Sequence, residues 1–500
     1  MKSIEPYTVA GLTGADQIVG VADSGLNDLS CFFYDISGTI TSRNGDLQSY
    51  RRKVIQYNVN SQFADAYDDE GGHGTHVSGS ISGNCLTDQF DTNGMASDSK
   101  IAFFDIGNAT YPYLDTYNTY NIFRTAFDAG ARVHSDSWGS DSSGSYDWSS
   151  YYADTFMWDN PEMLIIVAAG NSGEDGFNTV GAPGTGKNVL TVGAAMPRLT
   201  DYDVVNPEIT VAYFSSLGPT NDGRFGVDLI APGYYIMSAL AGNISALINA
   251  VSSGHGKLEA GVLKMSGTSM ATPVTSGAAL LIRQYLSNTN FWATNCVKGA
   301  VYCKRLSSPS AALVKAMLIT SCTPAKRYSV EHDNQYTKLP SIYLGEPPDV
   351  YQGYGQVYLK GLLPLKDGSG LPANRQLFIY DNLAVKSKTA WYFTLAITDN
   401  TLIGVALKVT LAWTDPPLES KLSINSVLMN NVDLVVVGPD SKQYWGNRVQ
   451  GGDSNNTVEQ VYLTVQMGTY KVFLNSCLNY LCQCLIPSKC HIFFVLYRCM

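Results

Sequence analysis

Three short segments of this chain place an acid, a histidine and a serine among small residues. Asp23 ends the apolar run Ile18–Asp23. His73 follows two glycines and is the first residue of His-Gly-Thr-His, and Ser269 lies in Gly-Thr-Ser-Met-Ala. A serine hydroxyl is a poor nucleophile at neutral pH, so it needs a base within hydrogen-bonding reach and an acid that orients the base. The chain order, acid then histidine then serine, is one of the orders known for such sets. We therefore predict that Asp23, His73 and Ser269 form a nucleophilic triad.

Ser269 is predicted to begin a helix, because Pro273 then falls in the first turn, where proline is tolerated. The free N–H groups at that helix start favour developing negative charge. The small neighbours Gly267 and Ala271 leave room for a substrate backbone. The alternative role for a serine at this position is a helix cap. The accompanying segments with His73 and Asp23 favour the role of nucleophile.

His73 is predicted to act first as general base and then as general acid. His76, three residues later, is the competing candidate, and we expect it to pack as a structural histidine. A His-x-x-His metal pair is disfavoured, because the Glu of a His-Glu-x-x-His site is lacking. Asp23 would hold the tautomer of His73 and stabilise its charged form, with a turn or helix-cap aspartate as the alternative.

Asn171 follows Gly170 at the end of a second apolar run. An amide there can point into a cleft and donate to the oxyanion of an acyl-transfer intermediate, with the backbone N–H of Ser269 as the second donor. The alternative is a turn-forming asparagine before Ser172. The sequence predicts Asn171 as the oxyanion-hole residue.

The composition indicates a globular chain. Its 500 residues are 45% hydrophobic and 15% charged, which is enough for a large core and a second domain. The net charge of −10 disfavours nucleic acid as a partner, because phosphate binding needs a basic surface. No apolar run reaches the roughly 18 residues of a membrane helix. Because no signal peptide precedes the first predicted strand, we expect a truncated or fragmentary sequence.

Apolar segments alternate with longer segments of helical period through the first two thirds of the chain. The predicted buried strands are Ile18–Asp23, Lys100–Gly107, Ala131–Gly139, Met163–Asn171, Asn188–Ala195 and Val227–Gly233. The predicted helices are Asp115–Gly130, Asp147–Asn160, Ser269–Leu286 and Ser310–Ser321. Strands that are apolar on both faces are typical of a parallel sheet covered by helices. The pattern predicts a doubly wound α/β fold, whose sites collect at the carboxyl ends of strands.

Shorter, alternating strands follow from about residue 377 onward. They are Leu377–Tyr380, Ala390–Ile397, Val405–Trp413, Val432–Val437, Val458–Val465 and Thr469–Leu474. Turn-forming residues separate them, which is typical of an all-β sandwich or jelly roll. We therefore predict a catalytic domain over residues 1–365, a β-sandwich over 370–476 and a cysteine-rich tail of uncertain structure over 477–500.

The ten cysteines are unevenly distributed. Five are scattered, at Cys31, Cys85, Cys296, Cys303 and Cys322, and five crowd the tail, at Cys477, Cys482, Cys484, Cys490 and Cys499. Buried thiols and disulfides of a secreted protein are both open for the first five. Zinc in the tail is disfavoured by the one-residue spacing of Cys482 and Cys484. Three Asn-x-Ser/Thr triplets are compatible with secretion.

Together these residues resemble the subtilase family of serine proteases, with Asp23, His73, Asn171 and Ser269 in the places of acid, base, oxyanion donor and nucleophile. Further likeness lies in Ser137-Trp138-Gly139, Thr179–Gly181, Phe214–Pro219, Leu229–Gly233, Ser310–Ile319, Gly353–Val357 and Asn430–Pro439. The match points to the large alkaline subtilases with a C-terminal β-barrel, and some amoebal proteases fused to transporters are also similar. It stops after Ser476, which leaves the last strand of the barrel unaccounted for.

The resemblance implies a secreted endopeptidase of broad specificity that acts on proteins or peptides. Ser137, Trp138 and Gly139 would pair with the substrate backbone, and Gly170 and Gly181 would bound the primary pocket. Glu174, Asp175 and Met270 would lie nearby, the acids accepting a basic side chain and the methionine flanking the oxyanion site. A propeptide is expected but absent, and no cofactor is required for catalysis. Calcium is expected as a structural ligand at most, and the acidic cluster Asp68–Glu70 is expected to be solvated surface. A silent binding protein and the protease part of a larger transporter are the alternatives.

Overall fold

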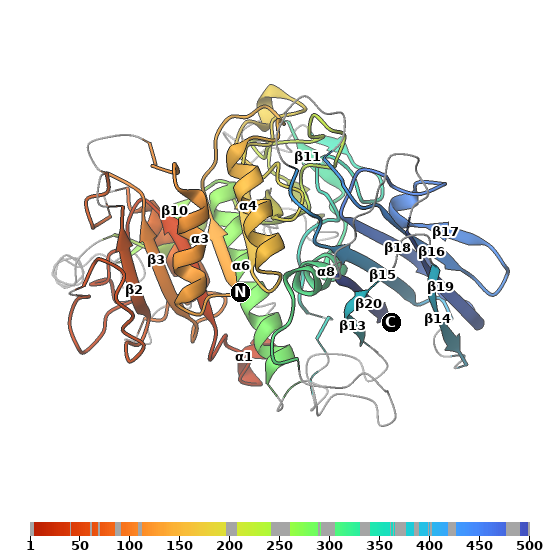
Figure 1. Cartoon of the computed structure of the whole chain (residues 1–500), viewed down its shortest axis with the longest axis horizontal. Coiled ribbons are helices and arrows are strands. Elements are labelled where there is room, and N and C mark those ends of the chain that lie inside the picture. The colour runs from red at the N-terminus through yellow and green to blue at the C-terminus, as the bar shows by residue number, and fades with distance from the viewer. Residues whose placement is uncertain are drawn as a thin grey trace.

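Two architectures follow one another along this chain in the computed structural model, an α/β layer structure and then two antiparallel sheets (Figure 1). The structure describes residues 5–40, 42–60, 63–68, 71–85, 92–108, 113–196, 208–241, 261–288, 291, 306–330, 341–360, 362–363, 365, 377–384, 390–398, 400, 403–418, 427–476 and 491–498.

Within the described residues, ten strands form one sheet in the N-terminal part. They are β1 (Ile18–Asp23), β2 (Val54–Val59), β3 (Lys100–Asp105), β4 (Val133–Asp136), β5 (Leu164–Ala168), β6 (Leu190–Met196), β7 (Thr210–Val211), β8 (Leu229–Pro232), β11 (Arg327–Ser329) and β12 (Ser341–Tyr343). The run β2-β3-β1-β4-β5-β6-β8 is parallel throughout. This confirms the predicted doubly wound parallel sheet. The sequence did not predict β2, because Gln56 and Asn58 interrupt its apolar pattern.

Helices cover both faces of this sheet. The helices of this part are α1 (Glu5–Val9), α2 (His73–Ser82), α3 (Thr119–Asp128), α4 (Trp148–Asp159), α6 (Thr268–Ser287) and α8 (Ala311–Ser321), and it also contains the 3-10 turn η1 (Gly173–Asp175). A second 3-10 turn, η3 (Gly446–Arg448), lies in the C-terminal part. None of the described helices combines the length and the apolar composition that crossing a membrane requires.

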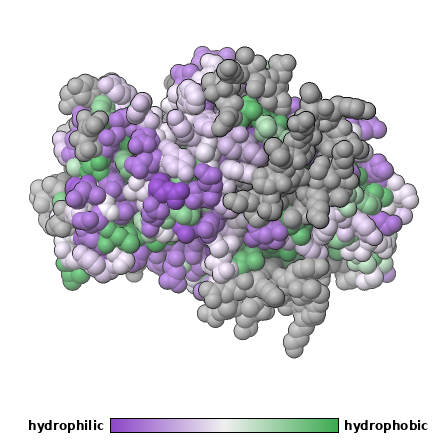
Figure 2. Space-filling view, viewed as in Figure 1, coloured by the Kyte–Doolittle hydropathy of each residue, from purple (hydrophilic) through white to green (hydrophobic). Residues whose placement is uncertain are grey.

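Two neighbouring residues of β4 show how the helices are divided between the faces. The ring of His134 packs edge-on against Phe123 of α3, with 5.0 Å between centroids. Ser135 instead lies 2.9 Å from Ser276 of α6, hydroxyl to hydroxyl. Successive side chains of a strand point to opposite faces, so α3 and α6 lie on opposite sides of the sheet. The outer surface of α3 is hydrophilic (Figure 2). Phe123 of the same helix is buried.

Two central strands end earlier than the sequence indicated. The segment predicted as Ala131–Gly139 ends as β4 at Asp136, and Met163–Asn171 ends as β5 at Ala168. Beyond these points the chain leaves the ladder, since Ser140 forms an isolated antiparallel bridge with Ala182. The residues released at the two strand ends line the cleft described below.

The described residues of the C-terminal part form two four-stranded antiparallel sheets. One has the order β13-β20-β15-β18 and the other β14-β19-β16-β17. Their bounds are β13 (Leu377–Ala384), β14 (Ala390–Ile397), β15 (Ala406–Trp413), β16 (Val432–Val437), β17 (Gln443–Trp445), β18 (Val458–Thr464), β19 (Gly468–Ser476) and β20 (His491–Arg498). A separate apolar cluster that includes Val409, Leu434 and Val472 is buried in this part. The predicted all-β second domain is therefore present. A short hairpin of β9 (Ile236–Ala239) and β10 (Val262–Met265) stands apart in the catalytic part.

Strand β20 lies inside the segment 477–500 that the sequence analysis set apart as a tail. It pairs with β13 and β15, for example through the register Thr410↔Val495. The predicted boundary at residue 476 therefore cuts through a sheet, because the segment 477–500 contributes a strand to it. The run Ile492–Tyr497 is apolar without alternation, so it lacked the signal that marked the other strands.

Buried polar contacts join the two domains. Lys187 and Asp415 are both fully buried, and Lys187 Nζ lies 2.6 Å from Asp415 Oδ2. The same ammonium donates to the carbonyl of Val427 at 2.6 Å. Asn188 exchanges hydrogen bonds with the backbone of Asp415 in both directions, each at 2.8 Å. The β-sandwich is thus fixed to the end of the catalytic domain near β6.

The cysteines in the described residues divide between both predicted states. Cys31 and Cys85 form a disulfide across 54 residues of sequence, whereas Cys322 is a free, buried thiol. Cys296, Cys303 and the five tail cysteines lie outside the described residues. The sequence left the pairing of Cys31 open, because nothing in its spacing distinguishes Cys85 from the other scattered cysteines.

Candidate active site

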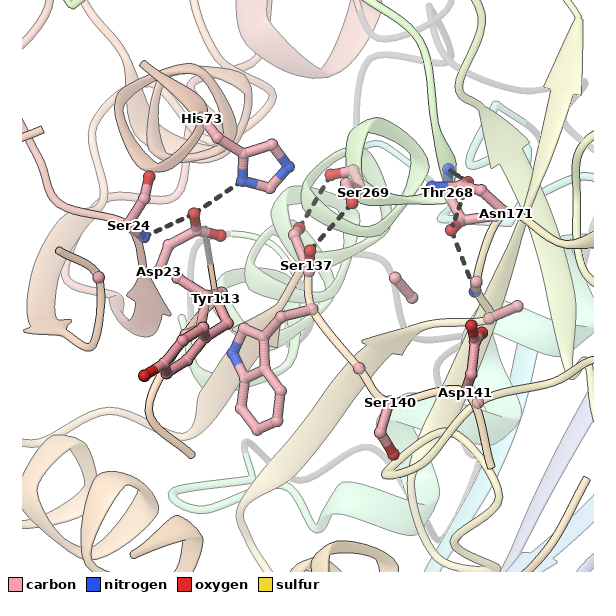
Figure 3. Close-up of a pocket in the computed structure, with 18 of the residues that line it drawn as sticks. Asp23, Ser24, His73, Tyr113, Ser137, Ser140, Asp141, Asn171, Thr268 and Ser269 are labelled. Carbon is pink, nitrogen blue, oxygen red and sulfur yellow. Dashed lines mark hydrogen bonds and ion pairs between the residues drawn. The ribbon is translucent and has the colours of Figure 1, made fainter. Parts of the chain in front are cut away.

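The carboxyl ends of β1, β4 and β5 and the first turns of α2 and α6 meet around one cleft of about 560 Å³ (Figure 3). Sites of open α/β sheets lie at this edge, because the strand ends there converge. All nine residues that the sequence predicted for the site line this cleft: Asp23, His73, Ser137, Trp138, Gly139, Gly170, Asn171, Gly181 and Ser269.

The acid and the histidine are in direct contact. His73 is the first residue of α2, and its Nδ1 lies 2.7 Å from Oδ1 of Asp23 at the end of β1. Asp23 is fully buried, whereas the His73 side chain is 34% exposed. The backbone N–H of Ser24 donates to the same carboxylate oxygen at 2.8 Å. A carboxylate bound at Nδ1 fixes the tautomer in which Nε2 carries the lone pair that can accept a proton.

A second carboxylate supports this pair from behind. Asp68 accepts the hydroxyl hydrogen of Ser24 at 2.8 Å and the backbone N–H of Thr75 in α2 at 2.8 Å. Ser24 in turn accepts the N–H of Gly74 at 3.0 Å. Burial, opposed by these hydrogen bonds, raises the pKa of Asp68 to about 6. Asp68 therefore ties the end of β1 to the start of α2, and it is not the solvated residue that we predicted; Asp69 and Glu70 lie outside the described residues.

His76 is held away from the cleft. It is fully buried, and its Nε2 lies 3.0 Å from the carbonyl oxygens of both Ile236 and Leu263. Burial lowers the pKa of His76 to about 4, so the ring stays neutral at physiological pH. These contacts agree with the predicted packing role and connect α2 to the β9–β10 hairpin.

Ser269 lies in the first turn of α6, one residue after the helix begins at Thr268. Its hydroxyl donates to the carbonyl of Ser137 at 2.9 Å, and the Ser137 hydroxyl donates back to the carbonyl of Ser269 at 2.8 Å (Figure 3). This reciprocal pair anchors the helix start to the end of β4. For Ser269 to attack a substrate, its O–H has to turn from Ser137 to a base, and such contacts commonly tighten only when substrate is bound.

Asn171 is oriented through its carbonyl end. Its Oδ1 accepts the backbone N–H of Thr268 at 2.9 Å and the Thr268 hydroxyl at 3.1 Å (Figure 3). The Thr268 oxygen also accepts the N–H of Gly170 at 3.2 Å. Because the oxygen of the amide is engaged at the start of α6, the Nδ2 hydrogens are the donors left for a ligand beside Ser269.

Glycines keep one wall of the cleft open. Gly170 has a φ of +106°, a conformation that residues with a side chain rarely adopt. A Cβ on Gly181 would lie 2.3 Å from the carbonyl oxygen of Ser140. Ala168 and Trp138 line the same space. The pocket is therefore bounded by small residues and one indole.

The structure adds residues that sequence reasoning missed. Ser24, Asn108, Tyr113, Ser140, Asp141 and Thr268 also line the cleft. Ser24 and Thr268 are neighbours of the predicted residues and could have been found from that, whereas Tyr113 lies in a loop without any recognisable pattern. Glu174 and Asp175, predicted at the rim, are not among the described lining residues.

Met270 was expected beside the oxyanion site. Its side chain is instead 1% exposed and belongs to the main apolar cluster. The helical turn at the start of α6 explains this, because consecutive residues of a helix point about 100° apart. While Ser269 faces the cleft, Met270 packs into the core.

Candidate metal ligands in the described part of the chain do not cluster. No group of three or more His, Cys, Asp or Glu side chains there is arranged to hold a metal ion. The cleft itself brings together the acid–histidine pair, a serine hydroxyl and hydrogen-bond donors.

Sequence comparison finds one family model and several serine proteases that are similar to this chain. Residues 14–343 match the family model of Peptidase_S8, the subtilase family. A serine protease/ABC transporter B family protein, tagB of Dictyostelium discoideum, is 28% identical over 523 residues, which cover 86% of this chain and 26% of tagB. The serine protease AprX of Bacillus subtilis is 40% identical over 122 residues, or 24% of this chain and 26% of AprX.

Among solved structures, the serine protease of Aeromonas sobria aligns with 98% of this chain and 89% of its own, with a TM-score of 0.44 and 14% identity. The chain spans about a quarter of the length of tagB, since the match covers 26% of that protein.

Proposed function

Because this chain belongs to the subtilase family, we propose that it is a serine peptidase that hydrolyses peptide bonds with Ser269 as nucleophile, His73 as base and Asp23 as orienting acid. The observation that carries this assignment is the 2.7 Å contact between Asp23 and His73 in the cleft that Ser269 also lines. The partly exposed His73 ring and the buried Asp23 carboxylate suit their roles, because the base has to reach substrate and the acid does not.

The proposed reaction has two halves. Ser269 Oγ attacks the carbonyl carbon while its proton passes to Nε2 of His73. The tetrahedral intermediate then breaks its C–N bond as His73 gives that proton to the leaving amine, which leaves an acyl ester on Ser269. Water attacks the ester, again losing its proton to His73, and the proton returns to Ser269 Oγ when the acid product leaves.

Two donors are proposed for the oxyanion. One is the backbone N–H of Ser269 and the other is Nδ2 of Asn171. The hydrogen bonds from Thr268 to Asn171 Oδ1 support this orientation of the amide. Donors that are fixed before the reaction stabilise developing charge without reorganising.

The substrate is proposed to bind as an extended strand along Ser137–Gly139, through backbone hydrogen bonds that are largely independent of side chains. The small residues Ala168, Gly170 and Gly181 leave a pocket for a large apolar or aromatic side chain. Specificity should therefore be broad, and a peptide library should show many residues accepted at the cleavage site.

Labelling with a fluorophosphonate probe tests the proposal and separates it from a silent binding protein of the same fold. We expect the parent to be labelled at Ser269, identified by mass spectrometry, and Ser269→Ala to be unlabelled. Ser287→Ala, at the far end of the same helix, is the matched control and should label normally. A folded parent that neither labels nor cleaves any peptide would contradict the proposal.

The likeness to tagB supports a second proposal, that this peptidase acts as one part of a larger transporter protein. Reading the transcript across the codon for Met500 tests it, because a transporter part would follow in frame. An extracytoplasmic site of action and maturation from a propeptide form are proposed with it.

The reaction as written requires no cofactor. We propose calcium only as a structural ligand, which a chelator would test by lowering the unfolding temperature of the folded enzyme.

A further inference from the structure

The charges around the cleft are unequal. Of the described residues that line it, none is Lys or Arg, and the acids are Asp23 and Asp141. Asp23 is fully buried and engaged by His73 and the N–H of Ser24. Asp141 is exposed, and among the described residues its carboxylate has no ion pair or hydrogen bond. Asp141 is therefore the fixed charge that a bound substrate would meet.

The backbone around Asp141 is held in place against the primary pocket. Ser140 and Ala182 exchange two hydrogen bonds, from Ser140 N at 2.8 Å and from Ala182 N at 3.2 Å. Gly144 N donates to Val180 O at 3.0 Å on the other side of the turn. These three bonds fix the segment that carries Asp141 next to Gly181. Figure 3 shows the Asp141 carboxylate turned toward the drawn cleft residues, on the side of Asn171.

The other acids near this edge are arranged differently. Asp147 caps α4 by accepting the N–H groups of Ser149 and Ser150, so its charge is used within the fold. Asp175 is exposed like Asp141, but it lies in η1 and is not among the described lining residues. Asp175 therefore offers a matched control for a change of charge outside the cleft.

We infer that Asp141 is a specificity-determining residue that makes the cleft favour Lys or Arg over Asp or Glu immediately before the scissile bond, in a pocket that also accepts apolar side chains. This inference rests on the proposed function and names its substrate class. A long basic side chain can lay its methylene stem along Gly170 and Gly181 and bring its cation to the carboxylate of Asp141. An apolar side chain of similar length fits the same wall, while an acidic one meets like charge. The pocket is thus broad for apolar residues, favours basic ones and disfavours acidic ones.

The size of the preference follows from the exposure of the carboxylate. An exposed ion pair is weak, and partial desolvation by bound substrate strengthens it, so we expect an effect of roughly threefold to tenfold on kcat/KM. Salt should weaken the preference, because exposed charges are screened.

The test uses three peptides that are identical except for Lys, Gln or Glu immediately before the scissile bond. The ratio of kcat/KM for the Lys and Glu peptides is measured for the parent, Asp141→Asn, Asp141→Lys and Asp175→Asn, each shown to be folded by circular dichroism. We expect the parent ratio to favour Lys and to fall with added salt. Asp141→Asn should lower it roughly threefold to tenfold, Asp141→Lys should shift it toward Glu, and Asp175→Asn should leave it unchanged.

The outcomes separate this inference from the proposed function. If the parent cleaves the peptides but Asp141→Asn keeps the parent ratio, or Asp175→Asn changes it equally, the role of Asp141 is wrong while the peptidase assignment stands. If the parent cleaves none of the three peptides and takes no fluorophosphonate label, the proposed function fails, and this inference fails with it.

Discussion

The acid–base pair in the cleft and the ion pair between the domains place similar groups in opposite surroundings. In the cleft, Asp23 is fully buried but His73 is 34% exposed. At the domain interface, Lys187 and Asp415 are both fully buried, 2.6 Å apart. Asp415 also accepts the N–H groups of Met429 and Asn430, each at 2.8 Å. In the cleft pair, the His73 side chain remains accessible to a ligand. In the interface pair, both charged groups are enclosed and take their hydrogen-bond partners from the protein itself.

The difference separates chemistry from stability. A group that reacts has to exchange protons with substrate, so part of the pair has to stay accessible. A buried ion pair whose partners are all supplied by the fold adds little net stability, but it is costly to break because the remaining charge stays buried. Changes in the cleft should therefore lower activity, and changes at the interface should lower stability.

The largest effect is expected at Ser269. Replacing Ser269 or His73 with Ala should lower kcat by on the order of 10⁶, the loss measured in subtilisin, while Asp23→Ala should cost less. The free energy of unfolding should change by only about 1 kcal/mol for Ser269→Ala, the size of a hydrogen bond such as the one to Ser137. Steady-state kinetics and chemical denaturation of the same samples check both. Normal turnover in Ser269→Ala would show that the assignment is wrong.

At the interface, Lys187→Met should lower the free energy of unfolding by about 3–5 kcal/mol, because it leaves Asp415 buried without its cation. The matched control is the exposed pair of Lys326 and Glu346, 3.1 Å apart. Lys326→Met should cost less than about 1 kcal/mol. Denaturant unfolding measures both variants, and equal losses would remove the contrast between buried and exposed pairs.

Asn171→Ala should lower kcat by on the order of 10²–10³, as loss of the side-chain donor does in subtilisin, with little change in KM. The fluorophosphonate label at Ser269 should persist in this variant, only more slowly, because the nucleophile and base remain. A rise in KM with unchanged kcat would instead assign Asn171 to substrate binding.

The structural role of Asp68 can be tested through the pH dependence of stability. Its pKa is raised to about 6 in the folded chain from 3.8, so the folded state binds the proton more tightly than the unfolded state. The stability that this group contributes is therefore present below about pH 4 and lost as pH rises through about 6. As pH rises from about 4 to about 6, the unfolding free energy of Asp68→Asn should increase by about 1–2 kcal/mol relative to that of the parent. This value is smaller than the full pKa shift would give, because Asp68 is partly exposed. Denaturation at a series of pH values measures this gain, and a difference that is constant with pH would contradict it.

The smallest effect is expected at Met270. Because Met270 packs in the core and not in the cleft, Met270→Leu should cost less than about 1.5 kcal/mol of unfolding free energy and leave kcat within about twofold. Activity and thermal unfolding of one sample check both. A loss of activity without a loss of stability would return Met270 to the oxyanion site.

The sequence by itself determined the doubly wound sheet and the residues at its strand ends. Buried parallel strands are apolar on both faces, so β1, β3 and β5 were visible as runs, and Asp23 stood out as a polar residue after such a run. Pro273 indicated the helix start at Ser269, because proline is tolerated in the first turn of a helix. These signals are local, and a single sequence carries them.

Only the tertiary structure decided which distant residues meet. Contacts between segments that are distant in sequence set three features of the structure. They are the hydrogen bonds of the Asp68 carboxylate, the disulfide from Cys31 to Cys85 and the position of Asp141 in the cleft. Strand β20 likewise became visible only through its neighbours β13 and β15, because its own pattern does not alternate. Burial and hydrogen-bond partners are properties of the packed chain, so no local pattern could distinguish Met270 in the core from Ser269 in the cleft.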